Sequence, residues 1–499
     1  MPSTFNFQHT YAEELPDFII PCAPTPALAP ELLVLNSDLA EELQIDTGSL
    51  TPEVAASLFS GNELPTDAQT VAQAYAGHQF GGFVPQLGDG RALLLGEVIG
   101  KSGQRFDVAF KGSGPTPFSR GGDGKAAIGP VLREYLIGEA MHALGIPTTR
   151  ALAAVRTGDL VTRERRLPGA VLTRVAASHI RVGTFQFFAA REQFELVRSL
   201  ADYAIKRHDP GLQDEPDRYL MLLKSVADRQ AKLVAQWMLV GFIHGVMNTD
   251  NTTISGETID YGPCAFMENY KPLTVFSSID TYGRYAYMNQ PKIANWNLAR
   301  FAETLLPLFD REPEQAVEVA MEVINGFLPK FEAYWLEGMR KKLGLLSFTN
   351  DDDEADRQLA EDWLSLMEEH SIDFTLGWYN LVPASYGHPF ALKELFKDNE
   401  AAIDPWLERY RARVAQARNG EVKESIKLML EHNPLFIPRN HLVEEALTAA
   451  SDNADLKPFE LLLSTIQKPF NDFCDPKQSK YWQPAPREFT SCYRTYCGT

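Results

Sequence analysis

The chain has 499 residues, 44% of them hydrophobic and 23% charged, which is typical of a globular protein with a large core and roughly two to four compact units. It carries 47 Lys and Arg against 66 Asp and Glu, and the resulting net charge of −19 disfavours charge-driven binding to nucleic acid or to an anionic membrane. The 5 cysteines are scattered and none has the spacing of a zinc ligand, so the sequence excludes a disulfide scaffold.

The N-terminal segment, MPSTFNFQHTYAEELP, lacks the basic and apolar stretches of a signal peptide and the Arg-rich character of a transit peptide. The most apolar predicted helix, at residues 237–246, is short and is interrupted by Gly and His, so we expect no membrane span. These features predict a cytoplasmic protein that binds neither nucleic acid nor membrane.

Four regions follow one another along the chain. Residues 1–70 are rich in proline and irregular, and we expect them to pack as an extension on the rest of the protein. Residues 71–180 predict a small β-rich lobe with one long helix, and residues 181–480 predict a large, mainly helical lobe. Residues 481–499 form a cysteine-containing tail. The sequence therefore predicts an α+β protein with two lobes.

The predicted elements of the small lobe are strands at residues 91–98 and 105–111, a helix over 130–144, and strands at 151–157 and 170–175. Pro130 fits the first turn of the helix and Gly145 fits its C-terminal cap. Long amphipathic helices of the large lobe are predicted at residues 191–208, 218–244 and 314–342.

Lys111 ends the predicted strand that contains VAFK, with its side chain on the face opposite Phe110. The glycine-rich stretch GSGPTPFSRGGDGK follows, and then the helix that carries Glu134 and Glu139. A strand lysine held by a helix glutamate contacts nucleotide phosphates in kinases. We expect Lys111 to pair with Glu134 rather than with Glu139; the alternative is a solvated strand lysine.

The segment HGVMNTDN, which ends at Asn251, and the segment IDYG, which contains Asp260, form the strongest polar cluster. Amide and carboxylate oxygens suit Mg²⁺ or Mn²⁺, so Asn251 and Asp260 are predicted metal ligands and Asp250 a predicted proton acceptor. Each segment alone could be only an Asx-turn. The base of a kinase would stand at Val246, and no GxGxxG loop precedes Lys111, which predicts a related but different transfer.

Basic residues and glycine turns complete the candidate nucleotide site. Arg174 and Arg181 flank the junction of the lobes and could bind phosphate oxygens in a bidentate manner, or could form structural ion pairs. Two glycine turns suit the close approach of a nucleotide, and their candidate residues are Gly88, Gly90, Arg91, Asp123 and Gly124.

Four long strings of the sequence resemble the selenoprotein O family, called YdiU in bacteria. They are YAGHQFGGFVPQLGDGRALLLGE, FKGSGPTPFSRGGDGKA, LREYLIGEAMHALGIPTTRAL and HGVMNTDN…IDYGP. The resemblance is nearly continuous from about residue 70 to 290 and looser beyond. It implies a protein-kinase-like fold in two lobes, and an enzyme that transfers AMP from ATP, bound in a flipped orientation, to Ser, Thr or Tyr hydroxyls of proteins.

The resemblance carries over to matching positions of this chain. Lys111 and Glu134 match the ion pair, Asn251 and Asp260 the metal ligands for Mg²⁺ or Mn²⁺, and Asp250 the proton acceptor. The matching nucleotide contacts are Gly88, Gly90, Arg91, Lys111, Asp123, Gly124, Arg174 and Arg181. Transfer of UMP from UTP is an alternative, because these residues contact mainly phosphates and indicate little about the base. A true kinase activity and a catalytically silent ATP-binding scaffold are further alternatives.

The C-terminal tail departs from the eukaryotic pattern of the family, whose members carry selenocysteine near the C-terminus. This chain has Cys492 there, followed by YRTYCGT with Cys497. Both are candidate redox residues, against the alternative of two incidental thiols. Residues 275–280, where some relatives place a partner cysteine, contain none.

Overall fold

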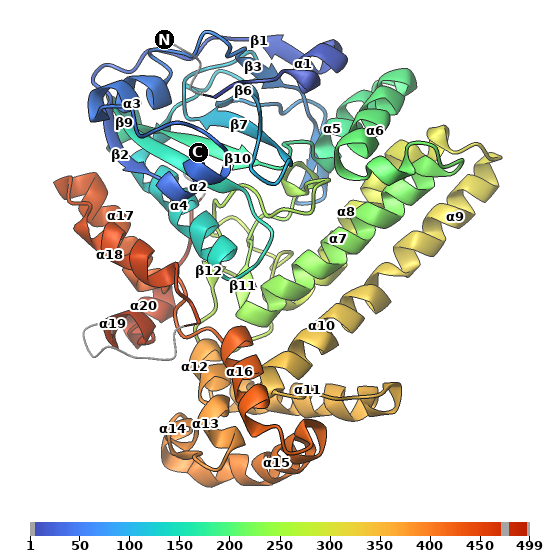
Figure 1. Ribbon diagram of the computed structural model, residues 1–499, viewed down its shortest axis with the longest axis vertical. Helices are drawn as coiled ribbons and strands as arrows, with labels where there is room; N and C mark the ends of the chain where they lie inside the picture. The colour runs from blue at the N-terminus through green and yellow to red at the C-terminus, as the bar shows by residue number, and fades with distance from the viewer. Residues whose placement is uncertain (1–4, 471–478, 497–499) are drawn as a thin grey trace.

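The N-terminal region is built around one antiparallel sheet, seen in a computed structural model that describes residues 5–470 and 479–496 (Figure 1). Within the described part of the chain the sheet has eight strands in the order β1-β3-β6-β7-β10-β9-β2, and β8 pairs with β10. The strands are β1 (Ile19–Pro21), β2 (Glu31–Leu35), β3 (Val71–Gln73), β6 (Ala92–Ile99), β7 (Arg105–Lys111), β8 (Ala126–Ala127), β9 (Arg150–Thr162) and β10 (Arg166–Ala176).

The two faces of the sheet pack against different helices because side chains alternate along each strand. Val108 and Phe110 of β7 lie in a buried cluster with residues of α2 (Ser37–Glu42) and α3 (Pro52–Ser60). The opposite face packs on α4 (Ile128–Ala143), which contacts β9 and β10. Lys111 is the last residue of β7 and pairs in register with Ala92 and Leu172, so it lies at the end of a central strand of the sheet. The sheet and α4 therefore hold Lys111 and Glu134 on neighbouring elements.

The segment before residue 70 contributes directly to this sheet, since β1 and β2 are its two outer strands. A separate two-stranded hairpin, β4 (Gly77–Gln79) and β5 (Gly82–Val84), follows β3. The described residues thus confirm the β-rich N-terminal part of the predicted α+β class. The boundaries at residues 70, 180 and 480 stay predictions.

The C-terminal region is mainly helical (Figure 1). Its helix α7 packs against α8 and α10. The longer helices are α5 (Val182–Ala189), α6 (Phe194–His208), α7 (Arg218–Val240), α8 (Gln290–Leu305), α9 (Pro313–Asn325), α10 (Phe327–Leu343), α11 (Asp353–Glu369), α15 (Asp404–Arg418), α16 (Val422–His432), α17 (Asn440–Asn453) and α18 (Lys457–Ile466). The shorter ones are α12 (Phe374–Tyr379), α13 (Leu381–Ser385), α14 (Phe390–Glu394), α19 (Ser479–Trp482) and α20 (Arg487–Cys492), and the N-terminal region has one more short helix, α1 (Thr10–Glu14). Among the described residues, none of these helices is long and apolar enough to cross a bilayer.

Two of the predicted long helices end earlier than the sequence pattern indicated. The predicted helix 314–342 is two helices, α9 and α10, because Pro329 has no N–H to donate to the carbonyl of Asn325. Helix α7 ends before Gly241, which caps it in the left-handed conformation with φ 73°. The next residues form β11 (Phe242–Ile243), which pairs with β12 (Ala265–Phe266). The loop between these two strands contains Asp250, Asn251 and Asp260.

The end of the chain returns to the N-terminal region. Helices α17 and α18 pack on α4, as the red and teal ribbons of Figure 1 show, and Glu444 accepts a hydrogen bond from Arg133 at 2.6 Å. The last described segment of the chain contains the short helices α19 and α20. Beyond them Thr495 pairs with Ser277, and its hydroxyl donates to the carbonyl of Pro263 at 2.7 Å.

Candidate active site

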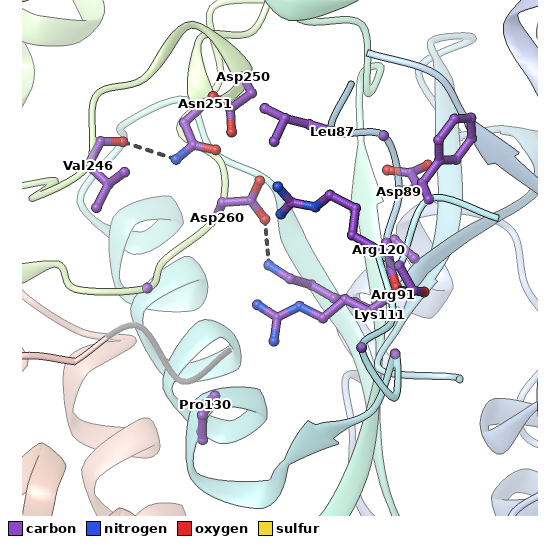
Figure 2. A pocket seen from close by; sticks show the side chains of 18 of the residues that line it. Leu87, Asp89, Arg91, Lys111, Arg120, Pro130, Val246, Asp250, Asn251 and Asp260 are labelled. Atoms are coloured by element: carbon purple, nitrogen blue, oxygen red, sulfur yellow. Dashed lines mark hydrogen bonds and ion pairs between the residues drawn. The ribbon is translucent and has the colours of Figure 1, made fainter. Parts of the chain in front are cut away.

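A cavity of about 660 Å³ brings together the predicted residues of the nucleotide and metal sites. It is bounded by the sheet and α4 on one side and by the loop between β11 and β12 on the other. Figure 2 shows Asp250 and Asn251 on one wall, with Arg91, Lys111 and Arg120 reaching from the opposite wall. Its lining includes Gly88, Gly90, Arg91, Lys111, Asp123, Gly124, Glu134, Arg174, Arg181, Asp250, Asn251 and Asp260.

The Lys111 ammonium lies between two carboxylates. Its Nζ is 2.6 Å from Oε2 of Glu134 and 2.5 Å from Oδ1 of Asp260. Glu139, the other candidate on α4, instead binds Arg150 through both carboxylate oxygens, at 2.6 and 2.8 Å. The structure therefore pairs Lys111 with Glu134, because the two glutamates point to different partners.

Asp260 is the meeting point of the positive charges in the cavity. Its Oδ1 accepts from Arg174 at 2.7 Å as well as from Lys111, and its Oδ2 accepts from Arg181 at 3.1 Å. Burial opposes ionisation, but Lys111, Arg174 and Arg181 together hold the pKa of Asp260 well below its usual value. Its backbone is left-handed, with φ 60°, a conformation that Asp tolerates better than most residues do. Asp260 is therefore an anion at neutral pH, held in a fixed place by three cations.

The two arginines are positioned by a buried network that sequence reasoning missed. Nε of Arg174 donates to Nε2 of His179 at 3.2 Å, and Nδ1 of His179 lies 3.0 Å from Asp107. Burial lowers the pKa of His179 to about 4, so the ring is neutral and accepts from Arg174. The guanidinium of Arg181 lies over the ring of Tyr75, 4.5 Å from its centre. These contacts fix both guanidinium groups toward the cavity.

Asp250 lies under the β4–β5 hairpin. Its Oδ2 accepts from Nε2 of Gln79 at 3.2 Å, whereas its buried Oδ1 has no hydrogen-bond partner in the described part of the chain. Burial raises the pKa of Asp250 to about 6, and the nearby Arg181 partly offsets that effect. An unpartnered carboxylate oxygen beside the cavity is able to accept a proton from a bound hydroxyl.

Asn251 and Asp260 lie close together and could share a cation. Nδ2 of Asn251 donates to the carbonyl of Val246 at 3.0 Å, and Figure 2 shows the amide oxygen on the side of Asp260. In the described residues no group of three or more His, Cys, Asp or Glu could hold a metal. Two oxygen donors fit Mg²⁺ or Mn²⁺, ions that commonly take their remaining ligands from water and substrate phosphates.

The turns that line the cavity need glycine because any side chain at these positions would clash with a neighbouring loop. A methyl group on Gly88, whose φ is 69°, would lie 2.3 Å from the ring of Phe118, and one on Gly124 would lie 2.1 Å from the carbonyl of Gly114. Asp123 binds Arg163 through both oxygens, at 2.8 and 3.1 Å. The glycines thus let the two loops pack closely at the rim, and Arg163 holds Asp123 there.

Further residues of the lining were not predicted from the sequence. They are mainly Tyr75, Gln79, Asp89, Arg120, Arg163 and Asn248. Asp89 stands between the two predicted glycines, and Arg120 lies in the glycine-rich stretch after Lys111, so their neighbours were a signal for both. Asn248 lies in the HGVMNTDN segment and had the same kind of signal, whereas Arg163 had none, because only the folded chain brings it to the cavity.

The candidate redox residue Cys492 is not part of the lining of this cavity. Cys492 is exposed at the end of α20 and forms no disulfide with the other described cysteines. It lines a second cavity of about 470 Å³, which shares Pro130, Tyr261 and Gly262 with the first. Cys497 lies outside the described residues. A redox role for either thiol stays a prediction.

Comparison with known proteins gives one consistent result. The sequence model of the family "Protein adenylyltransferase SelO" matches residues 2–467. The protein nucleotidyltransferase YdiU of Cereibacter sphaeroides strain KD131 is 56% identical over 499 residues, which cover 99% of this chain and 100% of the relative. The protein of the same name from Chromobacterium violaceum is 55% identical over 488 residues, 97% of this chain and 100% of the relative. That of Rhizobium rhizogenes strain K84 is 54% identical over 495 residues, 99% of this chain and 97% of the relative.

Proposed function

From the premise that this chain belongs to the protein adenylyltransferase SelO family, and is an enzyme of the nucleotidyltransferase class, we propose that it transfers AMP from ATP to a Ser, Thr or Tyr hydroxyl of a protein. Pyrophosphate is the other product. The observation that carries the proposal is the convergence of Lys111, Arg174 and Arg181 on Asp260, beside Asn251 and Asp250. The fold that we propose is the protein-kinase-like arrangement of two lobes.

The three cations are placed to hold a polyphosphate. All three contact Asp260, so their charges are concentrated within one short stretch of the cavity. Fixed cations that face developing negative charge stabilise a leaving group without reorganisation during the reaction. We therefore assign the β- and γ-phosphates to Lys111, Arg174 and Arg181, which directs the α-phosphate toward Asp250. This is the flipped orientation of ATP.

The transfer itself is a displacement at phosphorus. The hydroxyl oxygen of the acceptor forms a bond to the α-phosphorus, and the bond from that phosphorus to the bridging oxygen of the β-phosphate breaks. The hydroxyl proton passes to Oδ1 of Asp250, which is buried and has no hydrogen-bond partner among the described residues. Pyrophosphate leaves with its charge balanced by the three cations.

Asn251 and Asp260 would hold Mg²⁺ or Mn²⁺, which when bound supplies charge neutralisation to the phosphate oxygens. Lys111, Arg174 and Arg181 already neutralise Asp260 in this structure. A phosphate chain offers these side chains new acceptors, and the carboxylate is then available for the cation. Glu134 keeps Lys111 in place throughout, since it binds the ammonium independently of Asp260.

The test is incubation of the protein with Mg²⁺ and ATP labelled at the α- or the γ-phosphate, with intact-mass analysis. Incorporation of the α-label and an added mass of one AMP supports adenylyl transfer. Incorporation of the γ-label identifies a kinase and overturns the flipped orientation. A parallel reaction with α-labelled UTP separates uridylyl from adenylyl transfer. Binding of ATP with no transfer of either label to the protein or to added acceptor proteins identifies a silent scaffold.

A further inference from the structure

A groove of about 450 Å³ adjoins the candidate active site on the side of Asp250. It lies between the tip of the β4–β5 hairpin and the loop that leads into α8. The residues used below are Phe80 from the hairpin, Ile279, Tyr282 and Arg284 from the loop, and Lys292 and Ile293 from the start of α8.

The groove exposes apolar side chains to solvent. Tyr282 is 98% exposed, Ile279 is 53% exposed and Phe80 is 37% exposed. Single exposed apolar residues are common on protein surfaces, but a group of them around a concave surface is typical of a binding site. Apolar side chains of the kind that folding usually buries are therefore grouped on the surface beside the active-site cavity.

The same groove carries positive charge, in a protein with a net charge of −19. Arg284 lies over the ring of Trp296, 4.8 Å from its centre, and Lys292 is exposed on α8. Neither forms an ion pair with a carboxylate in the described part of the chain. The acid in the lining, Asp280, is buried and accepts the backbone N–H groups of Arg284 and Tyr285 at 2.9 and 2.8 Å. The exposed charge of the groove is therefore positive.

The groove and the active-site cavity are joined at Gln79 and Asn248, of which Gln79 binds Asp250 directly. Gln79 lines the active-site cavity and donates to Asp250, and the next residue, Phe80, lines the groove. The backbone N–H of Phe80 and the hydroxyl of Tyr285 both donate to Oδ1 of Asn248, at 3.3 and 2.7 Å, and Asn248 lines the active-site cavity. A chain lying in the groove could place a neighbouring residue beside Asp250.

We propose that this groove binds the acceptor segment of the protein substrate, and that the segment carries an apolar residue and an acidic residue close to the modified hydroxyl. The apolar residue packs against Phe80, Ile279 and Tyr282, and the acidic residue faces Lys292 and Arg284. This inference rests on the proposed transfer to protein hydroxyls and adds to it the chemical class of the acceptor.

The experiment measures peptide binding without nucleotide, so that it does not depend on the transfer reaction. Two fluorescein-labelled pools of short peptides with a central Tyr are compared, one with its other positions drawn from Leu, Glu and Gly and the other from Leu, Lys and Gly. Fluorescence anisotropy with the full-length protein gives the Kd of each pool. We expect the acidic pool to bind about fivefold more tightly than the basic pool, and the difference to shrink as salt is raised.

Two variants and their controls assign the binding to the groove. Lys292→Glu should weaken binding of the acidic pool about fivefold and strengthen that of the basic pool, whereas Lys423→Glu, at an exposed position on α16, should change neither. Tyr282→Ala should weaken both pools about fivefold, whereas Tyr386→Ala, at another exposed tyrosine, should not. Thermal unfolding confirms that each variant is folded.

The outcomes separate this inference from the proposed function. Equal binding of the two pools, or unchanged binding by Lys292→Glu and Tyr282→Ala, overturns the acceptor groove even if AMP is transferred. Peptide binding as expected with no transfer of AMP supports the groove and overturns the proposed reaction. A wild-type dimer in sedimentation that Tyr282→Ala converts to a monomer shows instead that the groove joins two copies of this chain.

Discussion

Gly77 of the β4–β5 hairpin stands directly against Asp250, and a methyl group added to Gly77 would lie 2.6 Å from Oδ1 of Asp250. The same oxygen is the one that has no hydrogen-bond partner among the described residues. The hairpin is therefore the wall that sets where the proposed proton acceptor points. Glycine is required at this place because of a close approach and not because of its backbone angles.

Gly77→Ala should consequently reduce transfer without unfolding the protein. The added methyl group displaces the Asp250 carboxylate, and misplacement of a catalytic group by about 1 Å costs roughly 10²-fold in rate. Steady-state kinetics should show a lower kcat with little change in KM for ATP. Gly211→Ala is the control, because a methyl group there would have no neighbour within 4 Å. Full activity of Gly77→Ala would contradict the placement of Asp250.

Asp250→Asn keeps the size of the side chain but removes the proton acceptor. We expect kcat to fall by about 10²- to 10⁴-fold while ATP binding is retained. ATP binding by calorimetry and transfer of the α-label are measured on the same preparation. Asp228→Asn serves as the control, since Asp228 binds Lys330 on the surface. A variant that keeps the wild-type kcat would remove Asp250 from the mechanism.

Lys111→Ala removes one of the cations assigned to the leaving group. We expect kcat/KM for ATP to fall by about 10²- to 10³-fold, as for the loss of other fixed donors in active sites. Lys101→Ala, which removes a lysine paired with Glu41 on the surface, should leave the value unchanged. Equal activity of the two variants would show that the ion pair with Glu134 is only structural.

Asp260→Asn tests the metal site. Asparagine also tolerates a positive φ, so the backbone at this position can be kept, whereas the charge that attracts a divalent cation is lost. Electron paramagnetic resonance measures the binding of Mn²⁺ in the presence of a non-hydrolysable ATP analogue. We expect this binding to weaken by more than about tenfold and AMP transfer to be lost. Undiminished Mn²⁺ binding would place the cation elsewhere.

Lys342 predicts a pH dependence of stability that is independent of the active site. Burial lowers its pKa from 10.5 to about 7, and its Nζ donates only to the carbonyl of His432 among the described residues. Between about pH 7 and 10.5 the unfolded chain binds a proton that the folded chain does not, so this lysine makes stability rise with pH across that window. Lys342→Met should remove that rise and stabilise the protein near pH 7 by about 1 kcal/mol or more.

Chemical denaturation at a series of pH values measures this effect. Lys341→Met is the matched control, because Lys341 is adjacent in the chain but binds Glu337 on the surface. Its stability should follow that of the wild type at every pH. A wild-type slope that persists in Lys342→Met would assign the pH dependence to other groups.

Local patterns in the sequence were enough to place Lys111 and Glu134. The strand that ends at Lys111 and the helix that carries Glu134 have the apolar spacing of their element types, and β7 and α4 lie where the sequence predicts them. The same patterns misjudged the helix at residues 314–342, because helical spacing continues through a proline that breaks the hydrogen bonding.

The sequence by itself determined which residue types are present for the chemistry: a strand lysine, a helix glutamate, and the neighbouring Asp250, Asn251 and Asp260. These lie in short segments whose identity does not depend on distant parts of the chain. Only the tertiary structure decided that Arg174 and Arg181 share Asp260 with Lys111, and that the β4–β5 hairpin covers Asp250. The physical reason is that such contacts join residues far apart in sequence, and local periodicity carries no information about which buried charges will meet.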